Sequence, residues 1–471
     1  MNWKETLLAH KQTRIAEHLE KIGPDSRARL EKQLAEIDFD ELDSLIRKYV
    51  LQKPETAIPA DLSPAPFFRM KPENCAQAEY YRKAEAKGRE LLAAGKVAML
   101  VVAGGQGTRL GFDGPKGTYP ICPVTGKTLF QYFAEEIGRF AEKYGHVLHW
   151  YIMTSELNDR ATREFFKSHD YFSLPADSVH FFTQGTMPAI GYDGQLLLGA
   201  EDSLALSPNG HGGTLLALKK SGALDEMKQL GVEYISYFQV DNPLVPMADV
   251  LFLGLHCLEG ARMSARMLPK TNAFEKLGNF CMSGGRLHII EYSDMPDELA
   301  QKKNADGELA FLAGSPAMHV ISRDFIEELT ADGKLNLPWH RADKKVPFLN
   351  AAGEIVKPEE PNAVKLESFI FDALPLASKT MILEGCRAEH FAPTKNQTGV
   401  DSAESCRQMM CVRDARRLEL AGFKIPRHPD GTPDCCVEIS PALVCDDEDA
   451  VARLSPEVYI TPEPGESVFY A

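Results

Sequence analysis

The sequence lacks any long apolar run. No stretch of its 471 residues approaches the length that crosses a membrane, and the first residues, MNWKETLLAHKQTR, contain no apolar signal core. These absences argue against a membrane protein and against secretion. We expect a protein of the cytoplasm that has no membrane partner.

Positive charge is also scarce. The chain has 52 Lys and Arg against 67 Asp and Glu, which gives a formal net charge of −15. Nucleic-acid backbones attract basic faces, so this balance argues against a nucleic-acid partner. A free nucleotide stays open as a ligand, because a local cluster of cations can outweigh the overall sign.

The ten cysteines show neither a C-x-x-C pair nor a regular spacing. Together with the absent signal segment, this favours reduced thiols over a disulfide framework. We expect the two closest sets, Cys435-Cys436 and Cys406…Cys411, to be structural or incidental rather than metal-binding.

What the chain does have is enough apolar material for a large core. With 44% hydrophobic residues over this length, it should divide into two or three domains. Buried strands expected at 149–154, 179–182 and 234–240 alternate with helices expected at 128–144, 159–169 and 214–230. This β-α-β alternation predicts a doubly wound α/β sheet.

The regions before this alternation have a different pattern. Residues 2–50 and 74–95 have the apolar spacing of helices, and proline-rich residues 53–70 are expected to form a linker across the surface.

The most informative stretch is VAMLVVAGGQGTRLGFDGPKGTYPI, residues 97–121. Seven apolar or small residues, Val97–Ala103, suit a strand that is buried on both faces. Gly104 and Gly105 then allow a sharp turn and close contact with a ligand, and Arg109 and Lys116 add two cations. A strand followed by such a turn is typical of an anion site, and we interpret the anion as a polyphosphate.

Two familiar phosphate motifs do not fit this stretch. The dinucleotide fingerprint G-x-G-x-x-G fails because the third glycine, Gly111, comes one place late. The P-loop fails because Ile121 stands where the first glycine is required before Gly126-Lys127-Thr128.

The string G-G-x-G-T-R-L-G followed by P-K-G resembles the signature of the sugar-nucleotide pyrophosphorylases, which are nucleotidyltransferases with a GT-A-like core. Its exact form is most similar to the eukaryotic-type UDP-sugar pyrophosphorylase family, and within it to the UDP-N-acetylglucosamine enzymes. The resemblance spans nearly the whole chain in at least six motifs. It implies a GT-A/Rossmann-like mixed central sheet flanked by helices, with a small helical N-terminal domain (1–95), a central domain (96–392) and a small β-containing C-terminal domain (393–471).

The resemblance also implies a set of site residues. The positions matching catalytic residues of the family are Arg109, Lys116, Asp241 and Lys395, with Asp241 in a Val-Asp-Asn motif as the ligand of Mg²⁺. The positions matching substrate-binding residues are Gly104, Gly105, Gln184, Gly210, His211, Gly278, Glu291 and Lys365. Taken without the neighbouring motifs, Gln184 is better interpreted as a capping or turn glutamine, and a helix cap or a turn is a common role for an aspartate such as Asp241.

The implied reaction joins UTP and a hexose 1-phosphate into a UDP-sugar and pyrophosphate. Gln184 would pair with uracil, because an amide offers both a donor and an acceptor. Glu291 would accept hydrogen bonds from sugar hydroxyls. Lys365 and Lys395 would hold the sugar phosphate, and Arg109 and Lys116 the leaving phosphates.

Two departures from the family pattern concern the sugar. His211 replaces an asparagine of the N-acetylglucosamine enzymes, and this Gly-His-Gly form resembles UDP-glucose and broad-specificity enzymes. Residues 314–319, GSPAMH, lack two further asparagines of the family pattern, and Met318 replaces one of them. The sugar is therefore N-acetylglucosamine 1-phosphate, glucose 1-phosphate or both. The opposing class of function is a non-catalytic nucleotide-sugar sensor on the same fold.

Overall fold

A computed structural model describes residues 2–53 and 58–471. Internal contacts divide the chain into two compact units. Unit 1 contains Met1–Ile58, Gln184–Gly213 and Asn336–Asp372, and unit 2 contains Pro59–Thr183, Thr214–Leu335 and Ala373–Ala471. Residues 59–95 thus belong to the same unit as the sheet, and the N-terminal helices belong to the other. These two units do not follow the expected domain boundaries at 95 and 392. The division into three independently folding domains stays a prediction.

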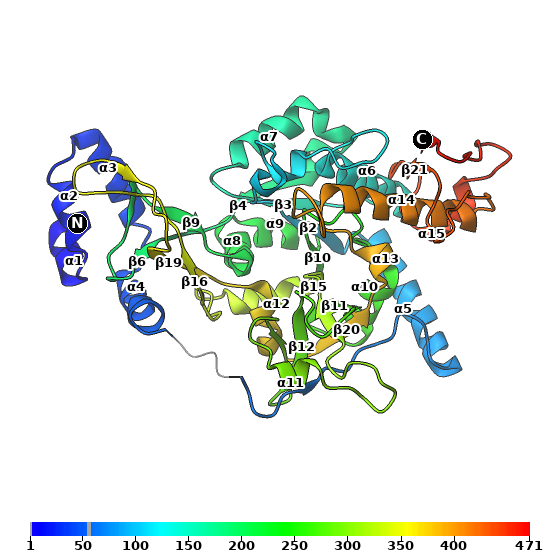
Figure 1. Ribbon diagram of the computed structural model, residues 1–471, viewed down its shortest axis with the longest axis horizontal. Coiled ribbons are helices and arrows are strands. Elements are labelled where there is room, and N and C mark those ends of the chain that lie inside the picture. The colour runs from blue at the N-terminus through cyan, green and yellow to red at the C-terminus, as the bar shows by residue number, and fades with distance from the viewer. Residues whose placement is uncertain (1, 54–57) are drawn as a thin grey trace. The chain divides into compact units, whose positions relative to one another are not determined.

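Unit 2 is built on one mixed sheet of eleven strands in the order β1-β12-β14-β11-β15-β10-β2-β3-β4, with β13 beside β12 and β20 beside β11 (Figure 1). The strands are β1 (Ser63–Pro64), β2 (Val97–Val102), β3 (Trp150–Thr154), β4 (Val179–Thr183), β10 (Tyr234–Gln239), β11 (Met263–Pro269), β12 (Gly278–Ser283), β13 (Arg286–Ile290), β14 (Ala313–Ser315), β15 (His319–Ser322) and β20 (Thr380–Glu384). The pairs β10–β2, β2–β3 and β3–β4 are parallel, and β15 runs antiparallel to β10. The expected mixed sheet flanked by helices is confirmed.

Helices flank this sheet, and a C-terminal segment adds two parallel strands, β21 (Cys436–Ile439) and β22 (Ser467–Tyr470). The α-helices of unit 2 are α5 (Cys75–Ala93), α6 (Leu129–Tyr144), α7 (Asp159–Ser168), α8 (Thr214–Lys220), α9 (Ala223–Gln229), α10 (Val250–Leu258), α11 (Asp297–Ala300), α12 (Arg323–Leu329), α13 (Arg387–His390), α14 (Ala403–Leu420) and α15 (Asp447–Arg453). Short 3-10 turns are η2 (Thr108–Leu110), η3 (Lys116–Thr118), η4 (Asp170–Ser173) and η5 (Ala176–Ser178).

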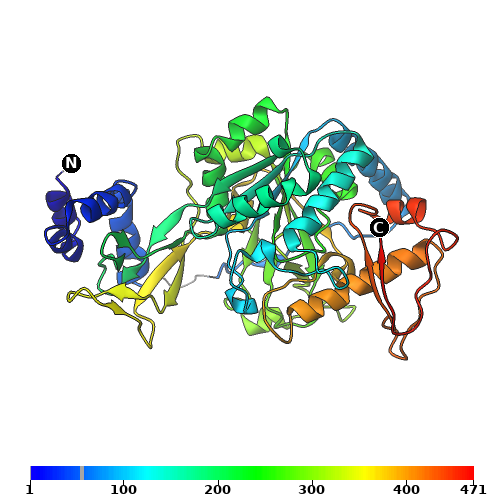
Figure 2. The same cartoon turned by 90° about the horizontal axis from the view of Figure 1, so that it is seen from above.

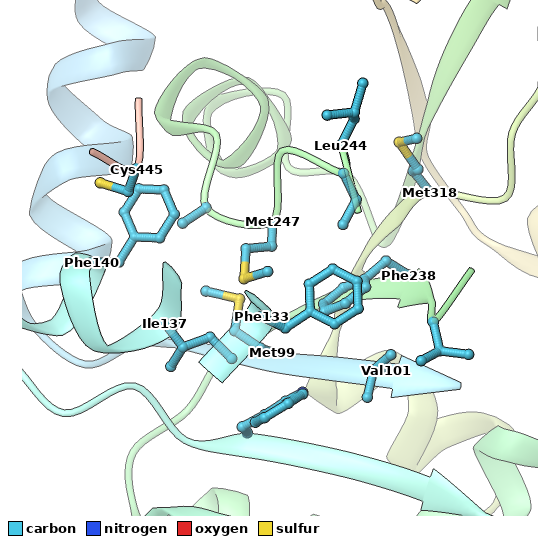
Figure 3. Packing of buried hydrophobic residues seen from close by; sticks show 14 of the residues in the cluster. Met99, Val101, Phe133, Ile137, Phe140, Phe238, Leu244, Met247, Met318 and Cys445 are labelled. Carbon is cyan, nitrogen blue, oxygen red and sulfur yellow. The ribbon is translucent and has the colours of Figure 1, made fainter. Parts of the chain in front are cut away.

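The core of unit 2 forms where α6 packs on the central strands. The aromatic and aliphatic face of this helix is buried, and Phe133, Ile137 and Phe140 lie near Met99 of β2 and Phe238 of β10 (Figure 3). The five residues Val97–Val101 are all buried, which confirms a strand covered on both faces.

Two glycines let α5 and α10 approach each other closely. A Cβ on Gly88 would lie 2.0 Å from the carbonyl oxygen of Val250, and one on Gly254 would lie 1.7 Å from that of Ala84. This backbone contact explains why residues 75–93 belong with the sheet of unit 2.

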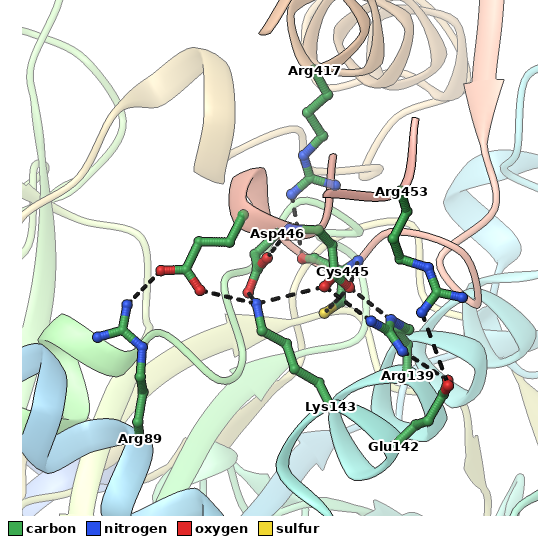
Figure 4. A network of polar contacts seen from close by, with 10 residues as sticks. Arg89, Arg139, Glu142, Lys143, Arg417, Cys445, Asp446 and Arg453 are labelled. Atoms are coloured by element: carbon green, nitrogen blue, oxygen red, sulfur yellow. Dashed lines mark hydrogen bonds and ion pairs between the residues drawn. The ribbon is translucent and has the colours of Figure 1, made fainter. Parts of the chain in front are cut away.

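An ion-pair network joins α6 to the C-terminal segment (Figure 4). Arg139 donates to both carboxylate oxygens of Asp449, at 2.7 and 3.0 Å. Lys143 pairs with Asp446 at 2.5 Å and with Glu448 at 3.2 Å, and Glu448 also pairs with Arg89 of α5. The network fastens α15 to two helices of the sheet unit.

Unit 1 combines N-terminal helices with small sheets from two later segments (Figure 2). Its helices are α1 (Trp3–Ala9), α2 (Thr13–Leu19), α3 (Pro24–Leu34), α4 (Phe39–Leu45), the π-helix η1 (Ile46–Leu51) and the turn η6 (His211–Gly213), and η7 (Ile370–Leu376) follows at its last boundary. Its strands are β5 (Thr186–Pro188), β6 (Ile190–Gly191), β7 (Leu198–Ala200), β8 (Ser203–Leu204), β9 (Leu206–Pro208), β16 (His340–Lys344), β17 (Phe348–Leu349), β18 (Ile355–Val356) and β19 (Ala363–Glu367). One hydrophobic cluster joins all three segments, with Leu7, Leu30, Leu196 and Leu366 among its members.

Two expectations about elements are wrong in part. The helix expected over 214–230 is two helices, because Gly222 between α8 and α9 has a φ of +82°. The expected surface linker contributes to the sheet, since Ser63 and Pro64 pair with Met282 and Cys281 of β12. Residues 54–57 of that linker lie outside the described residues. No helix in the described part of the chain has the length and apolar content needed to cross a membrane.

Candidate active site

The glycine turn and Asp241 lie at one edge of the sheet of unit 2. β2 and β10 are neighbouring parallel strands, with Val102 opposite Gln239, so the residues that follow each strand leave the same edge. The chain goes from β2 to β3 on one side, whereas β10 lies on the other side. In open α/β sheets, ligands bind outside the carboxyl ends of the strands where the strand order reverses in this way.

The turn after β2 is held in shape by hydrogen bonds to its backbone. Asn158 donates its side-chain amide to the carbonyl oxygens of Ala103 and Gly105, at 2.9 and 3.2 Å. The Ser155 hydroxyl donates to Gly104 at 2.8 Å. Both side chains follow β3, the next parallel strand, and the motif itself gave no indication of them. Their place at the same edge of the sheet is the signal that could have identified them.

Gly105 lies open at this turn. A Cβ built on Gly105 would have no heavy atom within 4 Å, and the residue is exposed. Packing therefore does not require a glycine here, and the free backbone suits the approach of a ligand. Arg109 is exposed in η2, a few residues further along the same loop.

Lys116 and Asp241 form a buried ion pair at this edge. The Lys116 Nζ lies 3.4 Å from an Asp241 carboxylate oxygen, and the two side chains are 11% and 12% exposed. The backbone on either side fixes Lys116, because Pro115 precedes it and Gly117 follows it, where a Cβ would collide with Phe130 at 2.2 Å. Because the pair is buried, the electrostatic interactions of its two charges are stronger than they would be in water.

The segment around Lys395 is tied to the same place. The Thr394 amide donates to the carbonyl oxygen of Asp241 at 2.8 Å, and the Asn242 side chain bonds Ala392 and His390. The backbone carbonyl oxygen of Asp401 accepts a hydrogen bond from the Lys395 amide at 2.7 Å. Burial raises the pKa of the Asp401 carboxyl, the Lys395 ammonium opposes this, and the Asp241 charge adds to it. The structure thus brings together Lys116, Asp241 and Lys395, with Asp401 as a carboxylate that sequence reasoning missed.

The two sugar-side positions of unit 2 lie beside each other. A Cβ on Gly278 would lie 3.5 Å from a Glu291 carboxylate oxygen, so this carboxylate lies against the glycine of β12. Met318, by contrast, is 4% exposed and belongs to the main hydrophobic cluster (Figure 3). Its side chain contributes to the core, and the expectation that it faces a sugar has no support from its packing.

The remaining predicted residues lie in unit 1. Gln184 is 8% exposed and donates its amide to the carbonyl oxygen of Gly210 at 2.6 Å. Gly210 has a φ of +87°, and a Cβ there would lie 2.2 Å from the Ser368 carbonyl oxygen. Here the glycine is required by the fold itself.

His211 is held by the segment after β19. The Ile370 amide donates to its Nδ1 at 3.2 Å, and its ring stacks on Phe369 at 5.2 Å between centroids. Burial lowers the pKa of His211 to about 4, and the nearby His340 contributes. His211 is therefore neutral at physiological pH. Lys365 lies on β19, half-buried, and burial lowers the pKa of its ammonium.

A separate group of metal-ligand atoms lies in the C-terminal segment. Atoms of Cys445, Asp446 and Asp449 lie within 4.8 Å of one another, the one such group within residues 2–53 and 58–471. Arg139 and Lys143 already neutralise these carboxylates (Figure 4). The group is accounted for as part of an ion-pair network.

Comparisons of the sequence and of the structure with known proteins match most of the chain to one group of related proteins. The sequence model of the family described as UTP–glucose-1-phosphate uridylyltransferase matches residues 41–414. The chain is 34% identical over 447 residues to the UDP-N-acetylhexosamine pyrophosphorylase-like protein 1 of Mus musculus, covering 90% of this chain and 88% of that protein. It is 34% identical over 448 residues to the UDP-N-acetylglucosamine diphosphorylase 2 of Arabidopsis thaliana, covering 90% and 85%. The crystal structure of the uridine diphosphate N-acetylglucosamine pyrophosphorylase of Trypanosoma brucei superposes with a TM-score of 0.82 at 26% identity, covering 99% and 97%.

Proposed function

This chain belongs to the UTP–glucose-1-phosphate uridylyltransferase family, and from this premise we propose that it is a uridylyltransferase. Its substrates are UTP and a hexose 1-phosphate, either N-acetylglucosamine 1-phosphate or glucose 1-phosphate or both, and its products are a UDP-sugar and pyrophosphate. The observation that carries the proposal is the buried Lys116–Asp241 pair beside the open Gly105, at the edge where two parallel strands end. The names of the relatives support the choice of N-acetylglucosamine.

The reaction needs no nucleophile from the protein. An oxygen of the sugar phosphate attacks the α-phosphorus of UTP in line, the bond to the β-phosphate oxygen breaks, and pyrophosphate leaves with that electron pair. Catalysis then consists of positioning and charge stabilisation. We assign Arg109 and Lys116 to the leaving phosphates, and Lys395 and Lys365 to the sugar phosphate.

The residues present fit a magnesium ion. Asp241 supplies a buried carboxylate, Asp401 lies near enough for the Asp241 charge to raise its pKa, and Mg²⁺ prefers one or two carboxylates together with phosphate oxygens. Asp241 would hold the ion, which would neutralise charge on the phosphates when bound. Lys116, 3.4 Å away, orients the Asp241 carboxylate and offers its own charge to a phosphate.

Base and sugar recognition are assigned to neutral and acidic side chains. Gln184 still has its carbonyl oxygen and a second N–H available for uracil after its bond to Gly210. We assign Glu291 to the sugar hydroxyls, because its carboxylate can accept hydrogen bonds from them, and it lies against Gly278, where a Cβ would come within 2.6 Å of Ile289.

The test is release of pyrophosphate with a panel of sugar 1-phosphates, with UTP and then ATP as the nucleotide. We expect turnover with UTP, little with ATP, and loss of activity on chelation of divalent cations that Mg²⁺ restores. Binding of UDP-sugar without any pyrophosphate release would favour a sensor instead. Equal rates with ATP would remove Gln184 from its assigned role.

A further inference from the structure

Two thiols from different elements of unit 2 are in contact. Cys411 of α14 and Cys436, the first residue of β21, have their sulfur atoms 3.3 Å apart, although 25 positions separate them in the sequence. A disulfide has a sulfur–sulfur distance of about 2.05 Å, so the two sulfur atoms need to approach each other by about 1.2 Å.

The backbone around the two thiols is already fixed at this spacing. The Ile439 amide, three residues after Cys436, donates to the Asp414 carboxylate, three residues after Cys411, at 2.9 Å. Arg413 holds the other Asp414 oxygen at 2.7 Å, and this carboxylate is buried. The helix and the strand are therefore joined next to the thiols, and side-chain rotation alone has to bring the sulfurs together.

The two thiols differ in exposure and acidity. Cys436 is partly exposed, whereas Cys411 is buried. The hydrogen bond between the two sulfur atoms lowers the pKa of Cys436 to about 7 and raises the pKa of Cys411. Since the thiolate is the nucleophile, Cys436 is the one that reacts first with an oxidant.

We propose that Cys411 and Cys436 form a reversible disulfide when a hydroperoxide oxidises the protein. The Cys436 thiolate attacks the outer peroxide oxygen, the O–O bond breaks, and the alkoxide or hydroxide takes up a proton, leaving a sulfenic acid. The Cys411 sulfur then attacks the Cys436 sulfur and releases its proton, and the hydroxyl group leaves with that proton as water. The two sulfurs together lose two electrons, which reduce the peroxide.

The disulfide would fasten two elements that hold the segment after Lys116. Glu438, two residues after Cys436, accepts the amides of Val124 and Thr125, both at 2.8 Å. Arg407, on the same helix as Cys411, donates to the carbonyl oxygen of Pro120 at 2.8 Å. The inference concerns thiol chemistry and does not depend on the proposed function.

The test uses the wild-type chain and hydrogen peroxide. After peroxide treatment, free thiols are alkylated, and the intact mass and the peptide map are measured. We expect two of the ten thiols to be protected, a single peptide pair joined through Cys411 and Cys436, and complete recovery of both thiols with dithiothreitol. Alkylation of both residues after oxidation would overturn the proposal, as would a cross-link that uses Cys435.

Variants separate the two roles. Cys411→Ser should leave a sulfenic acid on Cys436 that dimedone traps, and Cys436→Ser should leave Cys411 reduced. Cys435→Ser is the matched control, because it changes the adjacent thiol and should leave the cross-link unaffected. If the other variants fold poorly, the wild-type peptide map still decides the question. Sulfenic acid trapped on Cys411 in place of Cys436 would contradict the order of the steps.

Discussion

Two glycine-bearing loops of this molecule use the same residue type for opposite purposes. In unit 2, Gly105 has free space where a Cβ would stand, and its loop presents open backbone beside Lys116 and Asp241. In unit 1, Gly210 has a positive φ and lies directly against Ser368, and its neighbours Gln184 and His211 bond the protein's own backbone.

The difference shows what a glycine motif means physically. A glycine that packing does not need leaves room for a ligand, whereas one that packing needs shapes the loop. Both kinds read as glycine-rich turns in a sequence. We infer that the first loop contacts phosphate directly and that the second acts largely by holding polar side chains in position.

Removing a charge from the first loop should have the largest effect. We expect Lys116→Ala and Asp241→Asn each to lower kcat/KM for UTP turnover about a hundredfold or more, because the proposed mechanism assigns both buried charges to the phosphates. The measurement is steady-state pyrophosphate release together with circular dichroism. Lys127→Ala is the matched control, since Lys127 is nearby in sequence but pairs with Glu135 at 2.7 Å. Near-normal rates in either folded variant would remove the assigned site.

The two glycines themselves give the sharpest contrast in stability. Gly210→Ala should lower the free energy of unfolding by roughly 3 kcal/mol, because the new Cβ meets a carbonyl oxygen and the backbone is strained. Gly105→Ala should change it by less than about 0.5 kcal/mol while raising the KM for UTP. Denaturant unfolding of both variants decides the matter. A stable Gly210→Ala protein would show that the two loops do not differ as described.

The neutral state of His211 predicts a pH effect in the second loop. Its folded pKa of about 4 lies below the usual value of 6.5, so the unfolded chain binds more protons between these values and stability falls as pH falls from about 6.5 to 4. One such histidine accounts for about 1.4 kcal/mol at pH 5.5. The difference in unfolding free energy between pH 7.5 and 5.5 should shrink by that amount in His211→Asn.

Replacement of the exposed His146 by glutamine serves as the control for this titration. An unchanged pH dependence in His211→Asn would mean that the ring titrates normally in the folded protein.

The smallest expected effect concerns the choice of sugar. We expect activity with both N-acetylglucosamine 1-phosphate and glucose 1-phosphate, and a shift of several-fold in the ratio of their kcat/KM values in His211→Asn. The shift should be modest because His211 also holds the Ile370 amide. A wild-type preference above about a thousandfold, or a ratio that the substitution leaves unchanged, would contradict this prediction.

The sequence predicted the sheet and the first loop well because both depend on local patterns. The run Val97–Ala103 suits a strand buried on both faces, and the apolar spacing of α6 matches its buried face. The resemblance implied that Lys116 and Asp241 belong to one site, and the rule that parallel strands place their carboxyl ends at one edge explains their contact.

What the sequence could not predict depends on contacts between distant segments. Asn158 and Asp401 support the site through backbone hydrogen bonds that no motif records. Gly222 divides an expected helix because its left-handed conformation outweighed a continuous apolar pattern. Cys411 and Cys436 come together only because α14 and β21 pack on each other.

The assembly of unit 1 from three segments far apart in the sequence has a consequence for synthesis on the ribosome. The helices of residues 3–51 emerge before residues 196–366, yet their apolar faces pack on Leu196, Val364 and Leu366. At about 5 to 20 residues per second, the last of these partners is made roughly 15 to 60 s later. During that interval the nascent helices have an incomplete core, so they cannot reach their final packing until Leu366 has been made.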